Sequence, residues 1–403
     1  MKRKPLHSLL PFGLVLLALA VFICIHLRYV RVRQAEGSLY ATTRYLDQSE
    51  FSQAQQAIEN AARISPQNAH YLSTEALVQE RMLQWRFDFN QLQHPELNSN
   101  QKTHVENAIR YYQAVLKLNP NDDFVYHNLG WLYWYGQQKQ LAVDSLRKAI
   151  SIDFSVPLYH VSLGLVDEFS GDLTSALPEY SEALQQSPGL LDSRFFLDLQ
   201  RRRPAEAEQI VKDATASLEK ELAKGSNSIL KARLGKLYLT REPEKALSLL
   251  KDASASLPSL YRSWFNLGQA YELSGDQERM RQAYEKSVFV NRLEVQPLFR
   301  LGKYHDDRQN TQQAISYYRQ AVSGRLSQFS VHASRVRRIY LSNFTVHDDV
   351  IPNGMFLYTS PDFDVVWTCN RLAELYQQSG NEQQAAYYRE LMNGTARKLI
   401  LDP

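Results

Sequence analysis

Cysteine is almost missing from this chain, which has two, Cys24 and Cys369, among 403 residues. Cys24 lies inside a long apolar run and Cys369 lies near the far end, so no intramolecular disulfide is expected. No pair of cysteines has the spacing of a zinc ligand set. Two cysteines do not indicate the redox compartment.

Sequence motifs of cofactor and nucleotide chemistry are also missing. The chain has no P-loop and no dinucleotide fingerprint, and no serine or cysteine nucleophile pattern accompanies His127 or His160. Two "HDD" triplets, at 305–307 and 347–349, contain metal-ligating residue types, but consecutive aspartates on a helix point in different directions. We therefore expect no catalytic activity, no cofactor and no metal site.

An excess of positive charge is confined to the N-terminal region. All six charged residues before Gln34 are basic, so this region carries a charge of +6. The whole chain has a net charge of +3, which leaves the remainder at 3 − 6 = −3. A mildly acidic remainder has no basic footprint for nucleic acid, so no nucleic-acid partner is expected.

One long uncharged run lies near the N-terminus, after a basic tail at residues 1–8. Residues 9–27 are nineteen residues without a formal charge, enough to cross a bilayer as a helix. A cleavable signal peptide is the alternative, because Ala18 and Ala20 form an A-x-A pattern. Apolar residues continue to Ile25, however, which favours an uncleaved anchor. Three basic residues flank the run on each side and the amino terminus adds one charge, which favours an N-terminus inside the cytoplasm and the remainder outside it.

Beyond residue 34 the sequence repeats itself. Gly130 and Gly164 stand 34 residues apart in similar contexts, and so do Gly268 and Gly302. A small residue or methionine follows twelve positions after each glycine, and a larger apolar residue follows four positions later: Ala142, Ala176, Met280 and Ala314, then Leu146, Tyr180, Tyr284 and Tyr318. These spacings predict two helices per unit, with the glycine where the two helices approach most closely.

These residues resemble the tetratricopeptide repeat (TPR) family, whose pattern is W-x2-L-G-x2-Y, then A-x3-F-x2-A, then P. The best match is "WFNLGQAY", which begins at Trp264. Prolines close several units, at Pro66, Pro120, Pro188 and Pro258. The resemblance implies an all-α fold, a TPR-type α-solenoid of about eight to nine helical hairpins, preceded by one N-terminal transmembrane helix at 9–27.

The repeat pattern also predicts how the chain is divided. N-terminal TPR units are expected over 35–190, with an insertion near 85–101, and C-terminal units over 191–328, of which the first is degenerate. An irregular insertion is expected at 329–365, where the period fails, and a terminal TPR-like hairpin at 366–403.

In the TPR family the first helix of each unit lines a concave groove. Transferred residue by residue, the family's groove positions predict a partner-binding surface formed by Phe124, His127, Trp131, Trp134, Tyr135, Leu158, Val161, Leu165, Phe169, Arg262, Gln269 and Lys303. Trp131 and Trp134 would then form an exposed aromatic patch, and the alternative is that both pack in the core. The groove should be apolar near the anchor and polar further on, which suits a peptide or helix with an apolar anchor and a charged continuation.

The resulting functional prediction is a membrane-anchored scaffold or adaptor. It would bind protein partners in its groove and help to assemble an envelope complex. Because the architecture resembles bacterial inner-membrane repeat proteins, we expect a single-pass protein of that membrane with the solenoid outside the cytoplasm. The alternative is an accessory subunit of an envelope polysaccharide biosynthesis or export system, since tyrosine and tryptophan can stack on a glycan.

Overall fold

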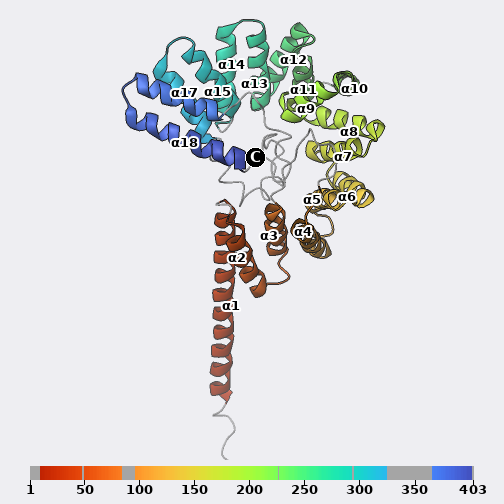
Figure 1. Cartoon of the computed structure of the whole chain (residues 1–403), viewed down its shortest axis with the longest axis vertical. Helices are drawn as coiled ribbons and strands as arrows, with labels where there is room; N and C mark the ends of the chain where they lie inside the picture. The colour runs from red at the N-terminus through yellow and green to blue at the C-terminus, as the bar shows by residue number, and fades with distance from the viewer. Residues whose placement is uncertain are drawn as a thin grey trace, which may run out of the picture. The chain divides into compact units, whose positions relative to one another are not determined.

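The regular structure in the computed structural model is entirely helical over the residues that are described. These are residues 10–47, 50–83, 96–225, 227–292, 295–324 and 365–401, with side chains described except at 10–20, 47, 194, 365 and 394–401. No strand occurs within these ranges, which confirms the predicted all-α class (Figure 1).

Two compact units divide the chain. The first consists of Met1–Gln84 and Glu96–Val125, and the second of Trp85–Pro95 and Tyr126–Pro403. The division therefore falls within the region 35–190, for which N-terminal repeat units were predicted.

The first unit contains two helical hairpins. Its helices are α1 (Leu10–Asp47), α2 (Phe51–Ile64), α3 (Ala69–Met82) and α4 (Ser99–Leu118). The C-terminal part of α1 packs on α2 around Ala35 and Ile58, which are 1% and 0% exposed. Asn98 begins α4 with a capping box, in which Asn98 and Gln101 satisfy each other's backbone amides. The predicted insertion near 85–101 ends at this cap, and its residues 85–95 lie outside the described part.

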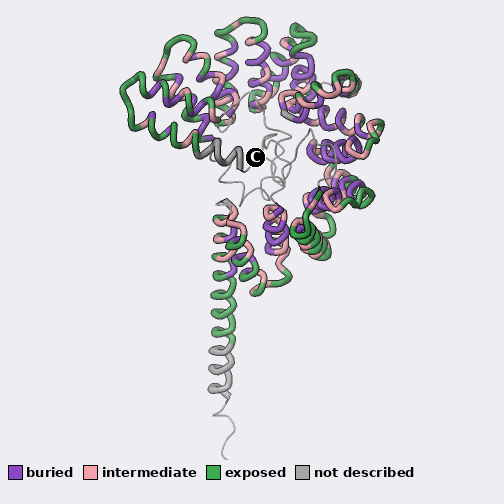
Figure 2. Tube along the Cα trace, in the orientation of Figure 1, coloured by how far each residue is buried: buried purple, intermediate pink, exposed green. Residues whose placement is uncertain are grey.

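Helix α1 is longer than a repeat helix needs to be. It is continuous for 38 residues, or about 57 Å at the usual rise per residue. Among the side chains described from Val21 onward, Ala35 is the first buried one, whereas Phe22, Ile25 and Tyr29 are 66%, 63% and 58% exposed (Figure 2). Among the described residues no helix is long and apolar enough to cross a membrane. The side chains of residues 9–20 lie outside the described part, so the anchor at 9–27 stays a prediction.

The second unit is a series of helix pairs that follow one another in chain order (Figure 1). Its elements are α5 (Asp123–Tyr135, shared with the first unit), α6 (Lys139–Ile152), α7 (Pro157–Phe169), α8 (Leu173–Gln186), η2 (Pro188–Asp192), α9 (Arg194–Arg202), α10 (Pro204–Leu222), α11 (Ser228–Tyr238), α12 (Pro243–Ser256), α13 (Tyr261–Leu273), α14 (Gln277–Val290), α15 (Val295–Asp306), a helix at 311–324, α17 (Val365–Gln378) and α18 (Glu382–Leu401). The predicted division of the array into units stays a prediction, and the irregular segment predicted at 329–365 lies almost wholly outside the described residues.

The glycines of the repeat lie where the two helices of a pair touch. A Cβ atom at Gly130 would lie 2.6 Å from Cγ of Leu146 and 3.3 Å from the carbonyl oxygen of Ala142. At Gly164 it would lie 2.5 Å from Cε1 of Tyr180. These separations are too short for real contacts, so the predicted close approach is confirmed, and the main obstacle is the large residue sixteen positions after the glycine.

Turns between paired helices reuse one left-handed backbone position. Gly171, Gly275 and Gly380 have φ values of 82°, 77° and 76°, and Gln137 and Gln309 occupy the corresponding turns with φ of 60°. Glycine adopts this conformation without strain, whereas a glutamine there costs free energy.

The degenerate unit replaces the glycine contact with aromatic packing. It is built from η2, α9 and α10, and its first helix has only nine residues. Phe195 and Phe196 are each 1% exposed, and Phe195 packs against Tyr180 of the preceding unit with ring centroids 5.0 Å apart. The array therefore continues through this unit although the sequence signature is lost.

Candidate functional site

The predicted aromatic patch is not on the surface. Trp131 and Trp134 are 4% and 2% exposed and belong to the large core of the second unit. The expectation that they form an exposed patch is therefore wrong, and the alternative that both pack in the core holds. Five other predicted groove residues are also buried, namely His127, Leu158, Val161, Leu165 and Gln269.

The cause of this burial is helix α7, which packs against the two tryptophans. The indole nitrogen of Trp131 donates a hydrogen bond to Oγ of Ser162 over 3.1 Å. The ring of Trp134 lies 6.1 Å from the ring of Phe169, centroid to centroid. Groove positions of one unit thus serve as contacts between units, which the family pattern did not indicate.

The remaining predicted residues are more accessible. Phe124, Tyr135, Phe169 and Arg262 are half-buried, and Lys303 is exposed. Lys303 is the member of the predicted set that lies most openly on the surface of the described chain. Whether any of these residues binds a partner stays a prediction.

His127 forms a hydrogen-bonded cluster that resembles part of a hydrolase site. Its Nε2 lies 2.9 Å from Oγ of Ser162, and its Nδ1 lies 3.3 Å from Oδ1 of Asn128. A serine therefore does accompany this histidine, which the sequence did not reveal. Ser162 and His127 are 0% and 1% exposed, and neither lines a described cavity. A substrate cannot reach Ser162, so the cluster joins α5 to α7 rather than performing catalysis.

Burial fixes the protonation state of this cluster. It lowers the pKa of His127 to about 4, and the hydrogen bond to Asn128 opposes the shift in part. The imidazole is therefore neutral near pH 7. Because the indole of Trp131 donates to Ser162, the serine hydroxyl can donate to Nε2 of His127, which leaves Nδ1–H of the imidazole to donate to Oδ1 of Asn128.

Two other histidines that the sequence singled out also have structural partners. His160 contacts Glu179 at 2.7 Å and the carbonyl oxygen of Phe154 at 3.0 Å. His305, from the first HDD triplet, is buried and stacks on Tyr317 with ring centroids 5.4 Å apart, so it packs in the core. No metal-binding group is found among the described residues, and the second triplet at 347–349 lies outside them.

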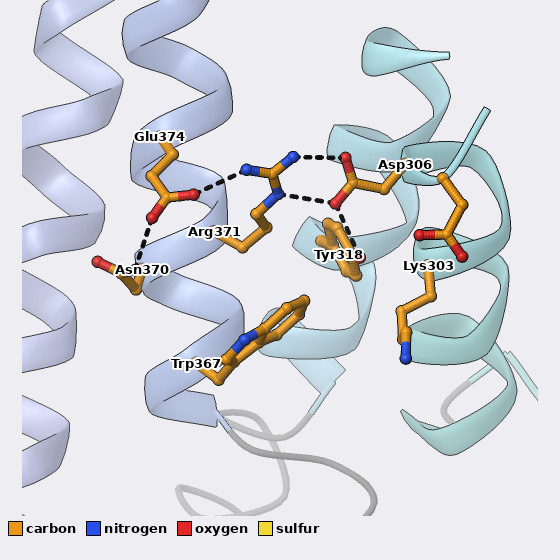
Figure 3. A pocket seen from close by; sticks show the side chains of 8 residues that line it. Lys303, Asp306, Tyr318, Trp367, Asn370, Arg371 and Glu374 are labelled. Atoms are coloured by element: carbon orange, nitrogen blue, oxygen red, sulfur yellow. Dashed lines mark hydrogen bonds and ion pairs between the residues drawn. The ribbon is translucent and has the colours of Figure 1, made fainter. Parts of the chain in front are cut away.

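Two cavities lie on the side of the second unit formed by the first helices of its pairs. The first, which we call the distal cavity, has a volume of about 370 Å³ and lies between α15 and α17 (Figure 3). It is lined by Lys303, Asp306, Asp307, Tyr318, Trp367, Asn370, Arg371 and Glu374. Trp367 is 42% exposed, which is unusual for so large an apolar side chain.

The second cavity, which we call the middle cavity, has a volume of about 660 Å³. Its walls come mainly from η2, α9, α11, α13 and α15. Leu197 and Leu273, which are 41% and 58% exposed, provide its apolar surface. Gln269 lies in its wall and accepts a hydrogen bond from Nζ of Lys236 over 2.9 Å. Two of the predicted groove residues, Gln269 and Lys303, thus line cavities.

A three-residue link joins neighbouring units, and two of its three examples include residues that line these cavities. A buried tyrosine of the second helix donates to a carboxylate at the end of the first helix, twelve residues earlier, and an arginine of the next unit binds the same carboxylate. The links are Tyr180–Glu168–Arg202, Tyr284–Glu272–Arg300 and Tyr318–Asp306–Arg371, with tyrosine to carboxylate distances of 2.7, 2.7 and 3.3 Å.

In two of these links the pKa of the tyrosine is raised. Burial and then the neighbouring carboxylate raise the pKa of Tyr180, and the same two causes raise the pKa of Tyr318. The hydroxyl therefore stays protonated and remains a donor across the physiological pH range.

The sequence prediction missed Trp367 and Arg371, which carry much of the distal cavity. A signal was present, because "VVWTCNRLAELY" of the terminal hairpin places a tryptophan and a tyrosine at spacings close to those of a repeat. The tyrosine–carboxylate part of the link was also readable from sequence, since the spacing of twelve between acid and tyrosine recurs in three units.

Comparison with known proteins identifies the repeats. Residues 125–155, 261–289 and 295–323 match the tetratricopeptide repeat family model. A stretch of 81 residues is 36% identical to BBSome complex member BBS4 of Bos taurus and covers 20% of this chain and 15% of that protein. The corresponding protein of Mus musculus is 35% identical over 81 residues. The matched region is therefore a small part of the length of these relatives.

Among solved structures, a chain described as "Human IFIT1 dimer with PPP-AAAA" aligns with 89% of this chain and 82% of its own length. The TM-score is 0.35 and the sequence identity is 14%. The family match shows that the chain contains tetratricopeptide repeats, a module that generally serves as a protein-interaction scaffold and not as a catalyst.

Proposed function

We propose that this protein is a membrane-anchored adaptor that binds protein partners along the first-helix side of its C-terminal repeats and helps to assemble an envelope complex. The observation that carries the proposal is the pair of cavities on this side, which expose Leu273, Lys303 and Trp367. Exposed large apolar groups beside polar ones are typical of surfaces that bind proteins.

Helix α1 supports the membrane part of the proposal. Its residues from Val21 to Val32 expose apolar side chains that no neighbouring helix covers among the described residues, and the uncharged run at 9–27 precedes and overlaps them. Lipid is the environment in which such a helix is stable. Arg28, Arg31 and Arg33 follow the run, where they would meet lipid head groups. Anchoring in a bacterial inner membrane, with the repeats outside the cytoplasm, belongs to the same proposal.

A second candidate function is an accessory role in an envelope polysaccharide system. Trp367 lies beside Asn370 and several carboxylates in the distal cavity, and an aromatic ring with amide and carboxylate neighbours can also hold a sugar. Trp131 and Trp134 are buried in the core, so they do not provide the aromatic surface on which a glycan was expected to stack.

The test compares partner capture by variants of the full-length protein purified in detergent. Leu273→Asp in the middle cavity and Trp367→Ala in the distal cavity should each weaken capture of the same partner by about tenfold, because the first places an unmatched charge in the interface and the second removes an exposed aromatic contact. Phe289→Asp is the matched control, since Phe289 is 80% exposed on α14 and lines neither cavity. Equal capture by all three variants, with unchanged thermal melts, would contradict partner binding along the first-helix side.

A further inference from the structure

In the distal cavity, the guanidinium of Arg371 is bound by carboxylates that line the same cavity. Nε and Nη2 of Arg371 donate to both carboxylate oxygens of Asp306 over 2.8 and 2.9 Å, and Nη1 donates to Glu374 over 2.7 Å (Figure 3). Nδ2 of Asn370 on the same helix also donates to Glu374, over 2.9 Å. Arg371 thus binds two carboxylates at once, and this triad keeps a net charge of −1.

Two charged side chains of the cavity remain outside this network. The side chains of Asp307 and Lys303 form no hydrogen bond or ion pair with the residues that the structure describes, and both are exposed. Because Asp307 and Lys303 have opposite charges, they leave the total charge of the cavity at −1. The cavity therefore favours a cation over an anion.

The ring of Trp367 offers a binding position for a cation in this cavity. Its indole is 42% exposed and lines the same cavity as Asp307 and Glu374. The face of an indole ring attracts a guanidinium or an ammonium group more strongly than other aromatic faces do. A cavity of about 370 Å³ has room for one long side chain.

The middle cavity has a different charge balance. Its three carboxylates, Asp192, Glu208 and Glu272, each pair with one cation of the wall, namely Lys236, Arg241 and Arg300. It contains no tryptophan, and its exposed apolar residues are leucines. The preference for a cation is therefore a property of the distal cavity and is not shared along the whole surface.

We infer that the distal cavity binds a basic side chain, arginine or lysine, of a partner polypeptide. The inference rests on the proposed function and specifies the partner at one point. The charged head of that side chain lies over Trp367 and faces the carboxylates of Asp307 and Glu374. The ammonium group of Lys303 repels that charged head. Removing the charge of Asp307 and removing the charge of Lys303 should therefore change binding in opposite directions.

The test uses the full-length protein in detergent and an array of twelve-residue peptides that vary in sequence. Each peptide is made in five forms, with arginine, lysine, citrulline, glutamine or glutamate at one central position. We expect the arginine form to bind roughly tenfold more tightly than its citrulline form, which has the same shape without the charge. Asp307→Asn should reduce this ratio to near one, and Lys303→Gln should raise it by about threefold. Asp213→Asn, on the exposed face of α10, is the matched control and should leave the ratio unchanged.

The outcomes separate this inference from the proposed function. Peptide binding that depends on Leu273 and Trp367 but not on the central charge would overturn the basic-side-chain inference and leave the adaptor function standing. Binding of a neutral oligosaccharide, with no peptide bound, would overturn both. Preference for the glutamate form would show that the cavity recognises an anion and would equally contradict the inference.

Discussion

Among single residues, Trp131 and Trp134 show how one repeat unit covers the first helix of the unit before it. A position that faces a groove in most repeat proteins can be covered by the next unit when that unit presents a complementary surface. Ser162 and Phe169 do this for Trp131 and Trp134. The spacing of Trp131 and Trp134 predicted their helix correctly, but the covering residues carry no periodic signal, so sequence reasoning could not tell core from groove. The glycine contact was predictable because one residue type recurs at one spacing.

A pH prediction follows from His127. Its pKa in the folded protein, about 4, is below the value of 6.5 for a free histidine, so the unfolded chain binds the proton more readily. Unfolding free energy should therefore be constant above about pH 7 and fall as the pH drops towards 4, by a total of about 3 kcal/mol from this group. His127→Gln should be less stable at pH 7 and should lose this part of the pH dependence. Urea unfolding of the wild-type protein and His127→Gln between pH 4 and 8 measures this pH dependence. If the unfolding free energies of the two proteins change with pH in parallel, His127 is not the group responsible.

Two glycines offer a matched pair of substitutions. Gly130→Ala should lower the unfolding free energy by about 1 to 3 kcal/mol, because its Cβ would collide with Leu146. Gly37→Ala should instead raise it by up to about 1 kcal/mol, since Gly37 lies in α1 with no atom within 4 Å of the new Cβ, and alanine favours a helix. Thermal melts of both variants decide the matter. Equal effects of the same sign would show that helix propensity, and not the close approach, governs these positions.

At the scale of elements, the tyrosine–carboxylate–arginine link explains how one helix pair is held to the next. The repeat spacing predicted the helix pairs, because an apolar stripe at helical period must be buried. It did not predict the arginine, which comes from 28 to 65 residues further along the chain and has no fixed spacing. The link at Glu168 is the most buried, with 0% of its side chain exposed, and receives bonds from Tyr180, Arg202 and Arg203.

Removing one member of this link should be costly. Arg202→Met leaves the buried Glu168 with one arginine instead of two, and should lower the apparent unfolding free energy by about 3 kcal/mol. Adding Glu168→Gln should recover part of the loss, because the uncompensated charge is then gone. A double-mutant cycle from urea unfolding gives the coupling energy. Simple additivity of the two changes would show that the link contributes nothing beyond its separate contacts.

For the whole molecule, the sequence predicted the all-helical architecture and the presence of tetratricopeptide repeats, because that information is local and repeated. It did not predict where the compact units separate or where the cavities lie, since both depend on packing between residues far apart in the chain. The distal cavity joins α15 to α17, on either side of a segment that has no repeat period.

Helix α1 yields a prediction about the behaviour of the whole chain. Removal of residues 1–33 should leave the thermal melt unchanged, because the described side chains from Val21 to Arg33 are all exposed and Ala35 is the first buried one among them. The shortened protein should be monodisperse without detergent, whereas the full chain should sediment as aggregates unless detergent or lipid covers its exposed apolar residues. Sedimentation velocity of both proteins checks this. A full chain that is monomeric in plain buffer would contradict the membrane part of the proposal.

The most direct test of partner binding on the first-helix side is site-specific photo-crosslinking in intact cells of the source organism. A benzophenone amino acid is introduced at Lys303 in the distal cavity, at Leu273 in the middle cavity and at Phe289 outside both. We predict that the first two positions give adducts to the same protein and that Phe289 gives none. Adducts to that protein from Phe289 alone, or from none of the three positions, would contradict the account.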